Sequence, residues 1–126
     1  MTAGDVPDAF DAYTVVILRR PLDAPELPED ELEALQERHL AYRAALGRRG
    51  VLVANGPFLE QSDPSFRGMS IFRCDPGEAA RLSAEDPSVV AGRLAFEVMQ
   101  WWVGADSLAF PGTEGTVGER RSVDDL

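Results

Sequence analysis

A run of apolar residues near the start of the chain, Tyr13–Arg19 (YTVVILR), limits the choice of folds more than any other feature. β-Branched and aromatic residues favour strands. A strand with so long an apolar stretch is typical of a position that is covered on both faces. We therefore predict that this segment is a central strand of a sheet, with other strands paired beside it.

A long amphipathic helix is predicted next, after a loop between Arg20 and Pro28 that holds three prolines. The helix is expected from about Glu29 to Leu46 or Arg49, and its first turn is acidic, which the helix dipole favours. Apolar residues recur every three or four positions and mark the face expected to be buried. That face holds Leu32, Leu35, His39, Tyr42 and Leu46, and the opposite, solvated face holds Glu33, Glu37, Arg38, Arg43 and Arg48.

The rest of the chain predicts three more strands and two short helices. They are a strand at Val51–Ala54 ended by the turn Asn55-Gly56-Pro57, a strand at Gly68–Cys74, a helix at Glu78–Ala84, a helical turn from Asp86-Pro87 to about Gly92, and a strand within Arg93–Val103. The order β-α-β-β-α-β is that of a ferredoxin-like fold, in which both helices lie on one face of a four-stranded antiparallel sheet. We therefore predict an α+β fold.

One domain is expected over residues 13–103, because a chain of 126 residues suits a single domain. Residues 1–12 are acidic and small and predict a loose N-terminal extension. Residues 104–126 hold several glycines and few apolar side chains, which predicts a mobile or partner-bound tail.

The second face of the predicted sheet has no helix to cover it. Apolar residues of the last strand, such as Phe96, Val98 and Trp102 or their neighbours, would meet water there. An exposed apolar sheet of that size is normally covered, and two copies of one chain can cover each other with the same patch. We therefore predict a homodimer.

Composition excludes several classes of function. The formal net charge is −10 at pH 7, from 22 acidic against 12 basic residues, so binding to nucleic acid or to an anionic membrane surface is not expected. No apolar run is long enough to span a bilayer, and the start of the chain lacks the pattern of a secretory signal, which predicts a cytoplasmic protein. The chain has no lysine, so catalysis through a lysine Schiff base is excluded.

Cys74 is the only cysteine, and the simpler interpretation of it is a small buried hydrophobe rather than a nucleophile. The chain has no residue spacing typical of a metal site and no glycine motif typical of a nucleotide site. We therefore predict no metal and no cofactor.

His39 and Asp86 are the residues that could carry chemistry. Histidine is the side chain whose unperturbed pKa lies near physiological pH, and the helical pattern turns His39, the only one, toward the interior. The simpler interpretation is a structural histidine at the edge of the core, whose polar ring is satisfied by one hydrogen bond. Asp86 precedes a proline and is suited to cap a helix, but one of its oxygens could still accept an imidazole N–H. Gly56 and Pro57 are first of all a turn.

Three stretches between Leu35 and Val103 resemble the YciI-like (YCII-related) family: ERHLAYRAALGRRGVLVANGPF, GMSIF and AEDPSVVAGRLAFEVMQWW. The likeness includes the order and spacing of the histidine, the Gly-Pro pair and the Asp-Pro-x-x-x-Ala-Gly motif. It implies a ferredoxin-like fold, assembly as a dimeric α+β barrel, and a histidine–aspartate pair in a pocket, which falls on His39 and Asp86. The N-terminal extension, the proline-rich loop and the C-terminal tail depart from the family pattern.

The resemblance implies activities such as dehydrochlorination of aromatic compounds, and related folds carry lactone isomerases. The first hypothesis is therefore a cofactor-free lyase or isomerase that acts on a small cyclic or aromatic metabolite by general acid–base chemistry, with His39 and Asp86 catalytic. Candidate substrate-binding residues are Tyr42, Asn55, Gly56, Pro57 and Phe58.

Other interpretations stay open. Tyr42 is as readily a core aromatic, and Arg43 and Arg73 could meet an anionic substrate, although solvated arginines are commoner. The chain could also be a non-catalytic small-molecule-binding or accessory protein of a metabolic pathway, or an interaction module that binds a partner through its tail.

Overall fold

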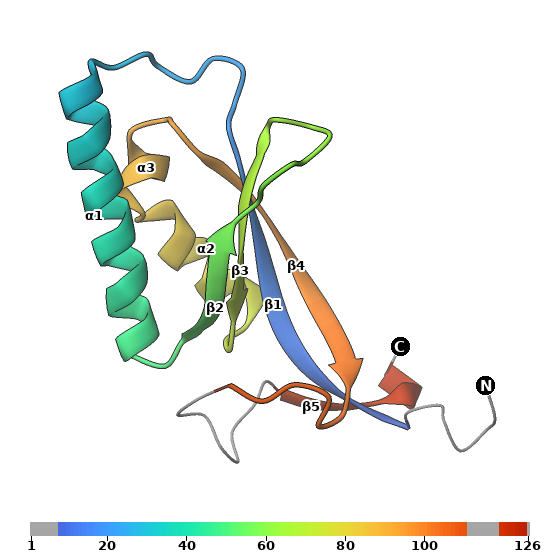
Figure 1. Ribbon diagram of the computed structural model, residues 1–126. Coiled ribbons are helices and arrows are strands. Elements are labelled where there is room, and N and C mark those ends of the chain that lie inside the picture. The colour runs from blue at the N-terminus through green and yellow to red at the C-terminus, as the bar shows by residue number, and fades with distance from the viewer. Residues whose placement is uncertain (1–7, 111–118, 126) are drawn as a thin grey trace.

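The computed structural model describes residues 8–110 and 119–125. Its strands are β1 (Ala9–Arg19), β2 (Leu52–Pro57), β3 (Phe66–Phe72), β4 (Ala95–Gly104) and β5 (Glu119–Ser122). Its helices are α1 (Glu29–Arg48), α2 (Pro76–Ala84) and α3 (Pro87–Val90), and a 3-10 turn, η2 (Val123–Asp125), follows β5. Figure 1 shows the helices gathered on one side of a twisted sheet. None of the helices in this part of the chain is long and apolar enough to cross a membrane.

The sheet is antiparallel and its main path has the strand order β2-β3-β1-β4. As its apolar sequence predicts, β1 is central: it pairs with β3 from Thr14 to Arg19 and with β4 from Phe10 to Arg19. β5 pairs with residues 9–12 of β1, the stretch that β3 leaves free. The predicted α+β ferredoxin-like fold with its four-stranded antiparallel sheet is confirmed, and β5 is added to it.

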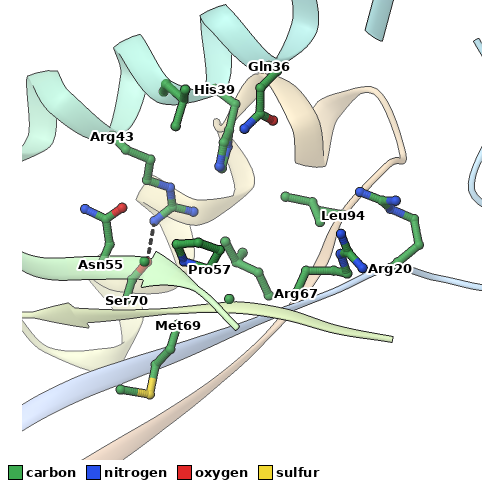
Figure 2. Close-up of a pocket in the computed structure, with 14 residues that line it drawn as sticks. Arg20, Gln36, His39, Arg43, Asn55, Pro57, Arg67, Met69, Ser70 and Leu94 are labelled. Atoms are coloured by element: carbon green, nitrogen blue, oxygen red, sulfur yellow. Dashed lines mark hydrogen bonds between the residues drawn. The ribbon is translucent and has the colours of Figure 1, made fainter. Parts of the chain in front are cut away.

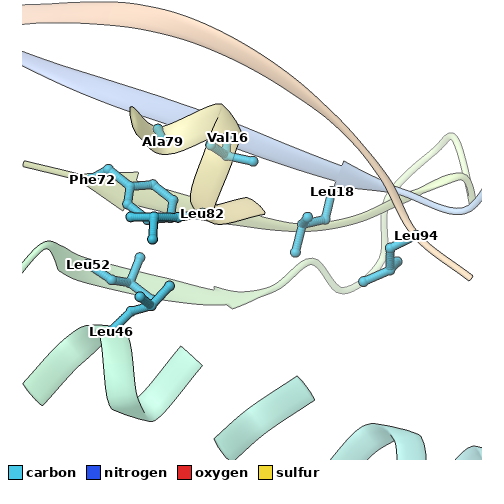
Figure 3. Packing of buried hydrophobic residues seen from close by; sticks show 8 residues of the cluster. All are labelled: Val16, Leu18, Leu46, Leu52, Phe72, Ala79, Leu82 and Leu94. Carbon is cyan, nitrogen blue, oxygen red and sulfur yellow. The ribbon is translucent and has the colours of Figure 1, made fainter. Parts of the chain in front are cut away.

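Alternation along β1 divides the core between the two faces of the sheet, because successive side chains of a strand point to opposite faces. Val16 and Leu18 belong to a cluster between the sheet and the helices (Figure 3). Tyr13 and Val15 point the other way and form a smaller cluster with Ile71. The other buried members of the helix-side cluster are Leu46, Leu52, Phe72, Ala79, Leu82 and Leu94.

The sheet takes in more of the chain than local composition predicts. β1 begins at Ala9, so residues 9–12 belong to the sheet and not to a loose extension, and Asp11 and Ala12 are buried. β5 lies within the predicted tail, 104–126. Both corrections have the same cause: distant strands fix these residues by pairing, which the composition of a short window does not reveal. The rest of the predicted extension and tail, residues 1–7, 111–118 and 126, lies outside the described residues.

β2 is longer than predicted because of a glycine in the neighbouring strand. The predicted turn Asn55-Gly56-Pro57 is instead the end of β2, paired with β3. A Cβ at Gly68 of β3 would lie only 2.8 Å from the backbone oxygen of Gly56. The missing side chain at position 68 thus lets the two backbones approach closely enough for β2 to continue.

β4 turns different apolar residues to each face of the sheet. Phe96 and Val98 pack against the helix-side cluster, and Trp102 packs against Phe10. Met99 and Trp101 face the other way and remain 43% and 40% exposed. The apolar residues that the last strand leaves exposed are therefore these neighbours, and not Phe96 and Val98.

Candidate active site

His39 and Arg43 lie on one face of α1 and point toward the sheet (Figure 2). They are four residues apart, so one side chain lies above the other. Leu35 and Leu46 of the predicted apolar face are buried, but Arg43 is buried as well, with 3% exposure. This corrects its assignment to the solvated face. The buried face of α1 is wider than the apolar stripe because α1 packs on α3 as well as on β2.

The acidic partner of both residues comes from the start of α3. Asp86 caps this helix: its Oδ1 accepts the Ser88 backbone N–H at 2.9 Å. The same carboxylate lies 2.9 Å (Oδ1) and 2.8 Å (Oδ2) from Nδ1 of His39, and Oδ2 accepts the Nε–H of Arg43 at 2.9 Å. One fully buried aspartate therefore joins the two helices, and it serves both as a cap and as the partner of the imidazole.

The surroundings of Asp86 keep its carboxylate ionised. Burial raises the pKa of this group. Hydrogen bonds from His39 and from the Ser88 N–H, together with the charges of His39 and Arg43, lower it by more, so the pKa lies below its ordinary value. An ionised carboxylate only accepts hydrogen bonds, so Nδ1 of His39 carries the hydrogen. In the neutral imidazole the other ring nitrogen, Nε2, then has a free lone pair and can act as a base.

Arg43 is fixed by several contacts, and one of its nitrogens still has no partner among the described residues. Its Nη1 donates to Oγ of Ser70 at 3.1 Å, the dashed line in Figure 2. Its guanidinium carbon lies 5.9 Å from the centre of the Phe72 ring, within the range of a cation–π contact. Its Nη2 is buried and has no hydrogen-bond partner among the residues that the structure describes. Because an unpaired buried donor is costly, Nη2 favours any acceptor that reaches it.

A cavity of about 210 Å³ lies between α1 and the β2–β3 pair (Figure 2). His39 and Arg43 reach it from the helix, and Arg20, Arg67 and Leu94 line its other end. The lining residues are Leu18, Arg20, Gln36, His39, Leu40, Arg43, Asn55, Gly56, Pro57, Arg67, Gly68, Met69, Ser70 and Leu94. The imidazole bonded to Asp86 is thus also part of a wall that a small molecule can touch.

Asn55, Gly56 and Pro57, which the sequence predicts as substrate-binding residues, all line this cavity. They do so as the end of β2, where Asn55 pairs with Ser70 of β3. Because Ser70 faces α1, its strand partner faces α1 too. These three residues therefore share the cavity with the histidine, although they form a strand and not the predicted turn.

Tyr42 and Phe58, also predicted to bind substrate, lie elsewhere. The Tyr42 hydroxyl donates to the backbone oxygen of Leu82 at 2.8 Å, and its ring packs against the helix-side cluster. The Phe58 ring packs edge-on against Phe66, with ring centres 6.5 Å apart. Neither residue lines the cavity beside His39, so the structure does not bring them to the candidate site.

Arg20 and Arg67 are residues of the cavity wall that sequence reasoning missed. No local signal joins them, because one follows β1 and the other lies in β3. Arg43 could have been placed from its spacing, one helical turn after His39. Arg73, the other arginine considered for an anionic substrate, does not line the cavity.

Cys74 follows the end of β3 and is partly buried. Burial, together with the nearby carboxylates of Glu78 and Asp75, raises the pKa of its thiol to about 11. The thiolate is the nucleophilic form, so Cys74 stays in its unreactive form at neutral pH. The interpretation of this residue as structural is the better one.

Comparison with known proteins adds a family match. The model of the YCII-related domain matches residues 13–102. No curated protein matches the chain. Among solved structures, that of a 5-chloro-2-hydroxyhydroquinone dehydrochlorinase from Burkholderia phenoliruptrix AC1100, in complex with 2,5-dihydroxybenzoquinone, is similar over 71% of this chain and 92% of that chain, with 16% sequence identity and a TM-score of 0.49. A likeness this distant carries no argument about activity.

Proposed function

This chain belongs to the YCII-related domain family, and we propose that it is a cofactor-free acid–base enzyme, a lyase or isomerase that moves a proton on a small cyclic or aromatic metabolite. One observation carries the proposal: His39 is bonded through Nδ1 to a buried carboxylate while its ring lines a cavity. The imidazole is thus held in one tautomer beside a space that a small molecule can enter. His39 is the proposed catalytic residue, and Asp86 is the residue that positions it.

The proposed reaction begins with His39 as a base. Nε2 takes a proton from a carbon next to a carbonyl group, and the electrons of the C–H bond form a C=C bond as the carbonyl oxygen becomes an enolate. In an isomerisation, the imidazolium returns the proton to another carbon. In an elimination, the enolate electrons expel a leaving group such as chloride from the adjacent carbon. Asp86 stabilises the imidazolium in both cases, and acid–base catalysis of this kind contributes roughly 10²–10⁴-fold.

The size of the cavity favours a substrate with one ring. Its volume is about 210 Å³, whereas a cavity of roughly 150 Å³ already accommodates benzene. Leu18, Leu94 and Pro57 supply apolar wall for the ring, and Asn55 and the arginines supply polar groups that could orient it.

Abstraction of a proton by His39 predicts that a substrate proton exchanges with solvent. A panel of one-ring cyclic ketones, enol-lactones and chlorinated hydroquinones would be incubated with the protein in D₂O, and exchange and product formation would be followed by NMR. We expect activity on at least one compound, reduced by about 10²-fold or more in His39→Gln. Arg38→Gln, an exposed neighbour on α1, should keep full activity.

Two outcomes would count against an enzyme. Turnover that is unchanged in folded His39→Gln rules out this histidine as the base. Compounds that occupy the cavity without exchange or turnover favour the alternative, a non-catalytic small-molecule-binding or accessory protein.

We also propose that the protein acts as a homodimer joined through the sheet face that the helices leave open. Val15, Met69, Met99 and Trp101 surround an apolar hollow of about 240 Å³ on that face. Such a patch is unfavourable in water, and a two-fold pairing would cover it on both copies at once.

A further inference from the structure

The cavity beside His39 is cationic, although the chain as a whole is strongly acidic. Arg20, Arg43 and Arg67 contribute to its wall, and no aspartate or glutamate is among the residues that line it in the described part of the chain. The formal net charge of the whole sequence is −10. A concave site lined by one sign of charge raises the local concentration of ligands with the opposite sign.

Arg20 and Arg67 form no ion pair with a carboxylate among residues 8–110 and 119–125. Nε of Arg20 donates to the backbone oxygen of Arg93 at 2.7 Å, and Nη1 of Arg67 donates to that of Pro64 at 3.4 Å. Neither acceptor carries a full negative charge. Burial and the charges of Arg93 and Arg67 lower the pKa of Arg20, so these guanidinium groups repel one another.

Arg19, the neighbour of Arg20 in the chain, does have carboxylate partners. Arg19 forms ion pairs with two carboxylates, at 3.3 and 3.6 Å. Arg20 borders a second hollow that Glu29 and Glu33 help to line, yet it pairs with neither. Its charge therefore remains available at the cavity.

Arg43 supplies a second, independent observation, a buried donor that no described residue satisfies. Its Nη2 is buried and unpartnered within the described residues, while its other nitrogens bond to Asp86 and Ser70. Figure 2 shows its guanidinium near Asn55 and Ser70, and Arg20 and Arg67 at the opposite end of the cavity, next to Leu94. A ligand that spans the cavity would thus meet cationic donors at both ends.

We infer that the cavity takes a one-ring carboxylate: Arg20 and Arg67 hold the carboxylate group, and Nη2 of Arg43 donates to an oxygen at the other end of the ring, beside His39. Arginine suits this task because its planar fork of N–H groups matches the two oxygens of a carboxylate. The inference builds on the proposed function, since it names the class of substrate for the same site. Recognition of the anion can nevertheless be measured by binding alone.

The test uses two acids and their amides, which share a ring and a shape but differ in charge: benzoate with benzamide, and 4-hydroxybenzoate with 4-hydroxybenzamide. Affinity would be measured by calorimetry, and contact with the site by the NMR signals of His39, which are unambiguous because the chain has one histidine. We expect each acid to bind about tenfold more tightly than its amide, or better, and to shift the His39 signals.

Substitution of either Arg20 or Arg67 should weaken the binding of the acids but not that of the amides. Arg20→Gln and Arg67→Gln should each reduce acid affinity about tenfold and leave amide affinity unchanged. Arg38→Gln changes the net charge equally at an exposed position away from the cavity and should have no effect. Arg20→Lys, which keeps the charge but loses the fork, should fall between wild type and Arg20→Gln. Thermal unfolding checks that each variant is folded.

Equal affinity for acid and amide, the absence of acid binding in the wild-type protein, or acid binding that is unchanged in both glutamine variants would overturn the inference. These results are separable from the test of catalysis. Selective acid binding without any exchange of substrate protons would support the anion site and contradict the proposed catalysis. Turnover of neutral rings that depends on His39 does the reverse.

Discussion

Among single residues, Asp86 is as much a structural group as a functional one. Its buried carboxylate caps α3 and accepts N–H groups from His39 and Arg43 of α1. Neutralising it would leave the Arg43 guanidinium buried beside an uncharged group. For this reason a substitution at His39, which is partly exposed, is the cleaner test of catalysis.

We predict that Asp86→Asn lowers the free energy of unfolding by about 3–5 kcal/mol, the usual effect of removing one partner of a buried ion pair. The asparagine can still accept one hydrogen bond at the cap, so the loss reports mainly the charge. Urea unfolding followed by circular dichroism measures it.

Asp75→Asn is the matched control for this change. Asp75 caps α2 by accepting the Glu78 N–H at 2.8 Å, but it is exposed and forms no ion pair with any residue that the structure describes. Asparagine caps a helix about as well as aspartate, so the change should stay within about 0.5 kcal/mol. Similar losses in the two variants would show that the cap, and not the ion pair, is what matters at Asp86.

The lowered pKa of Asp86 also gives stability a pH dependence of definite sign. In the unfolded chain an aspartate has a pKa of about 3.9, and in the fold the pKa of Asp86 is lower. Well above pH 4 or so the group is ionised in both states, and its contribution is fully present. As the pH falls through the unfolded and then the folded pKa, the unfolded state binds its proton first, and the contribution is lost.

The expected result is that the free energy of unfolding of the wild-type protein falls more steeply than that of Asp86→Asn between about pH 5 and pH 2. Urea unfolding at a series of pH values gives both curves. Parallel curves would mean that Asp86 does not take up its proton at a lower pH in the fold than in the unfolded chain.

The pairing of His39 with Asp86 was predicted through the family resemblance, whereas the polar–apolar pattern of the helix placed Arg43 on the wrong face. Local signals, an apolar stripe and a following proline, marked the two residues separately, and their atoms lie 2.8 Å apart. A polar–apolar pattern assigns every arginine to water. Arg43 is buried only because a carboxylate distant in sequence neutralises it, and that partner is a property of the tertiary fold.

Among the secondary-structure elements, the β2–β3 pair shows most clearly what a local pattern leaves out. Asn55-Gly56-Pro57 has the composition of a turn, yet it continues β2 and forms the strand wall of the cavity. What decides between strand and turn is the close approach of Gly68 in the next strand. A signal that lies on another element cannot be found within the segment itself.

Gly68→Ala should therefore destabilise the protein, whereas Gly56→Ala should not. A Cβ at Gly68 would lie 2.8 Å from the Gly56 oxygen and 3.4 Å from Cα of Pro57, so the strands would have to separate, at about 1–3 kcal/mol. A Cβ at Gly56 would meet no atom within 4 Å. With alanine the unfolded chain also has less conformational freedom to lose on folding than with glycine.

Thermal and urea unfolding of the two glycine variants compare these expectations directly. Equal stability of both with the wild-type protein would show that β2 does not depend on the close approach at Gly68. A loss confined to Gly56→Ala would reverse the explanation given for the length of β2.

For the molecule as a whole, the two faces of the sheet are unequal. The helices cover one face (Figure 1), while the other carries only the smaller cluster around Tyr13, Val15 and Ile71. Met99 and Trp101 extend that apolar surface to the solvent. In the described residues, helices thus cover one side of β1, whereas on the other side Leu108 and Phe110 pack against the smaller cluster and Met99 and Trp101 stay exposed.

If a second copy covers this face, a charge placed on it should separate the dimer. We predict that the wild-type protein sediments as a dimer and that Trp101→Arg sediments as a folded monomer, because each arginine would otherwise be buried in the pairing of the two sheets. Leu22→Arg is the control: Leu22 is fully exposed in the loop between β1 and α1, outside the strands that form the open face, and its substitution should leave the dimer intact. Sedimentation velocity over a range of concentrations measures all three. A wild-type monomer, or a dimer that survives Trp101→Arg, would mean that something other than a second copy covers the sheet.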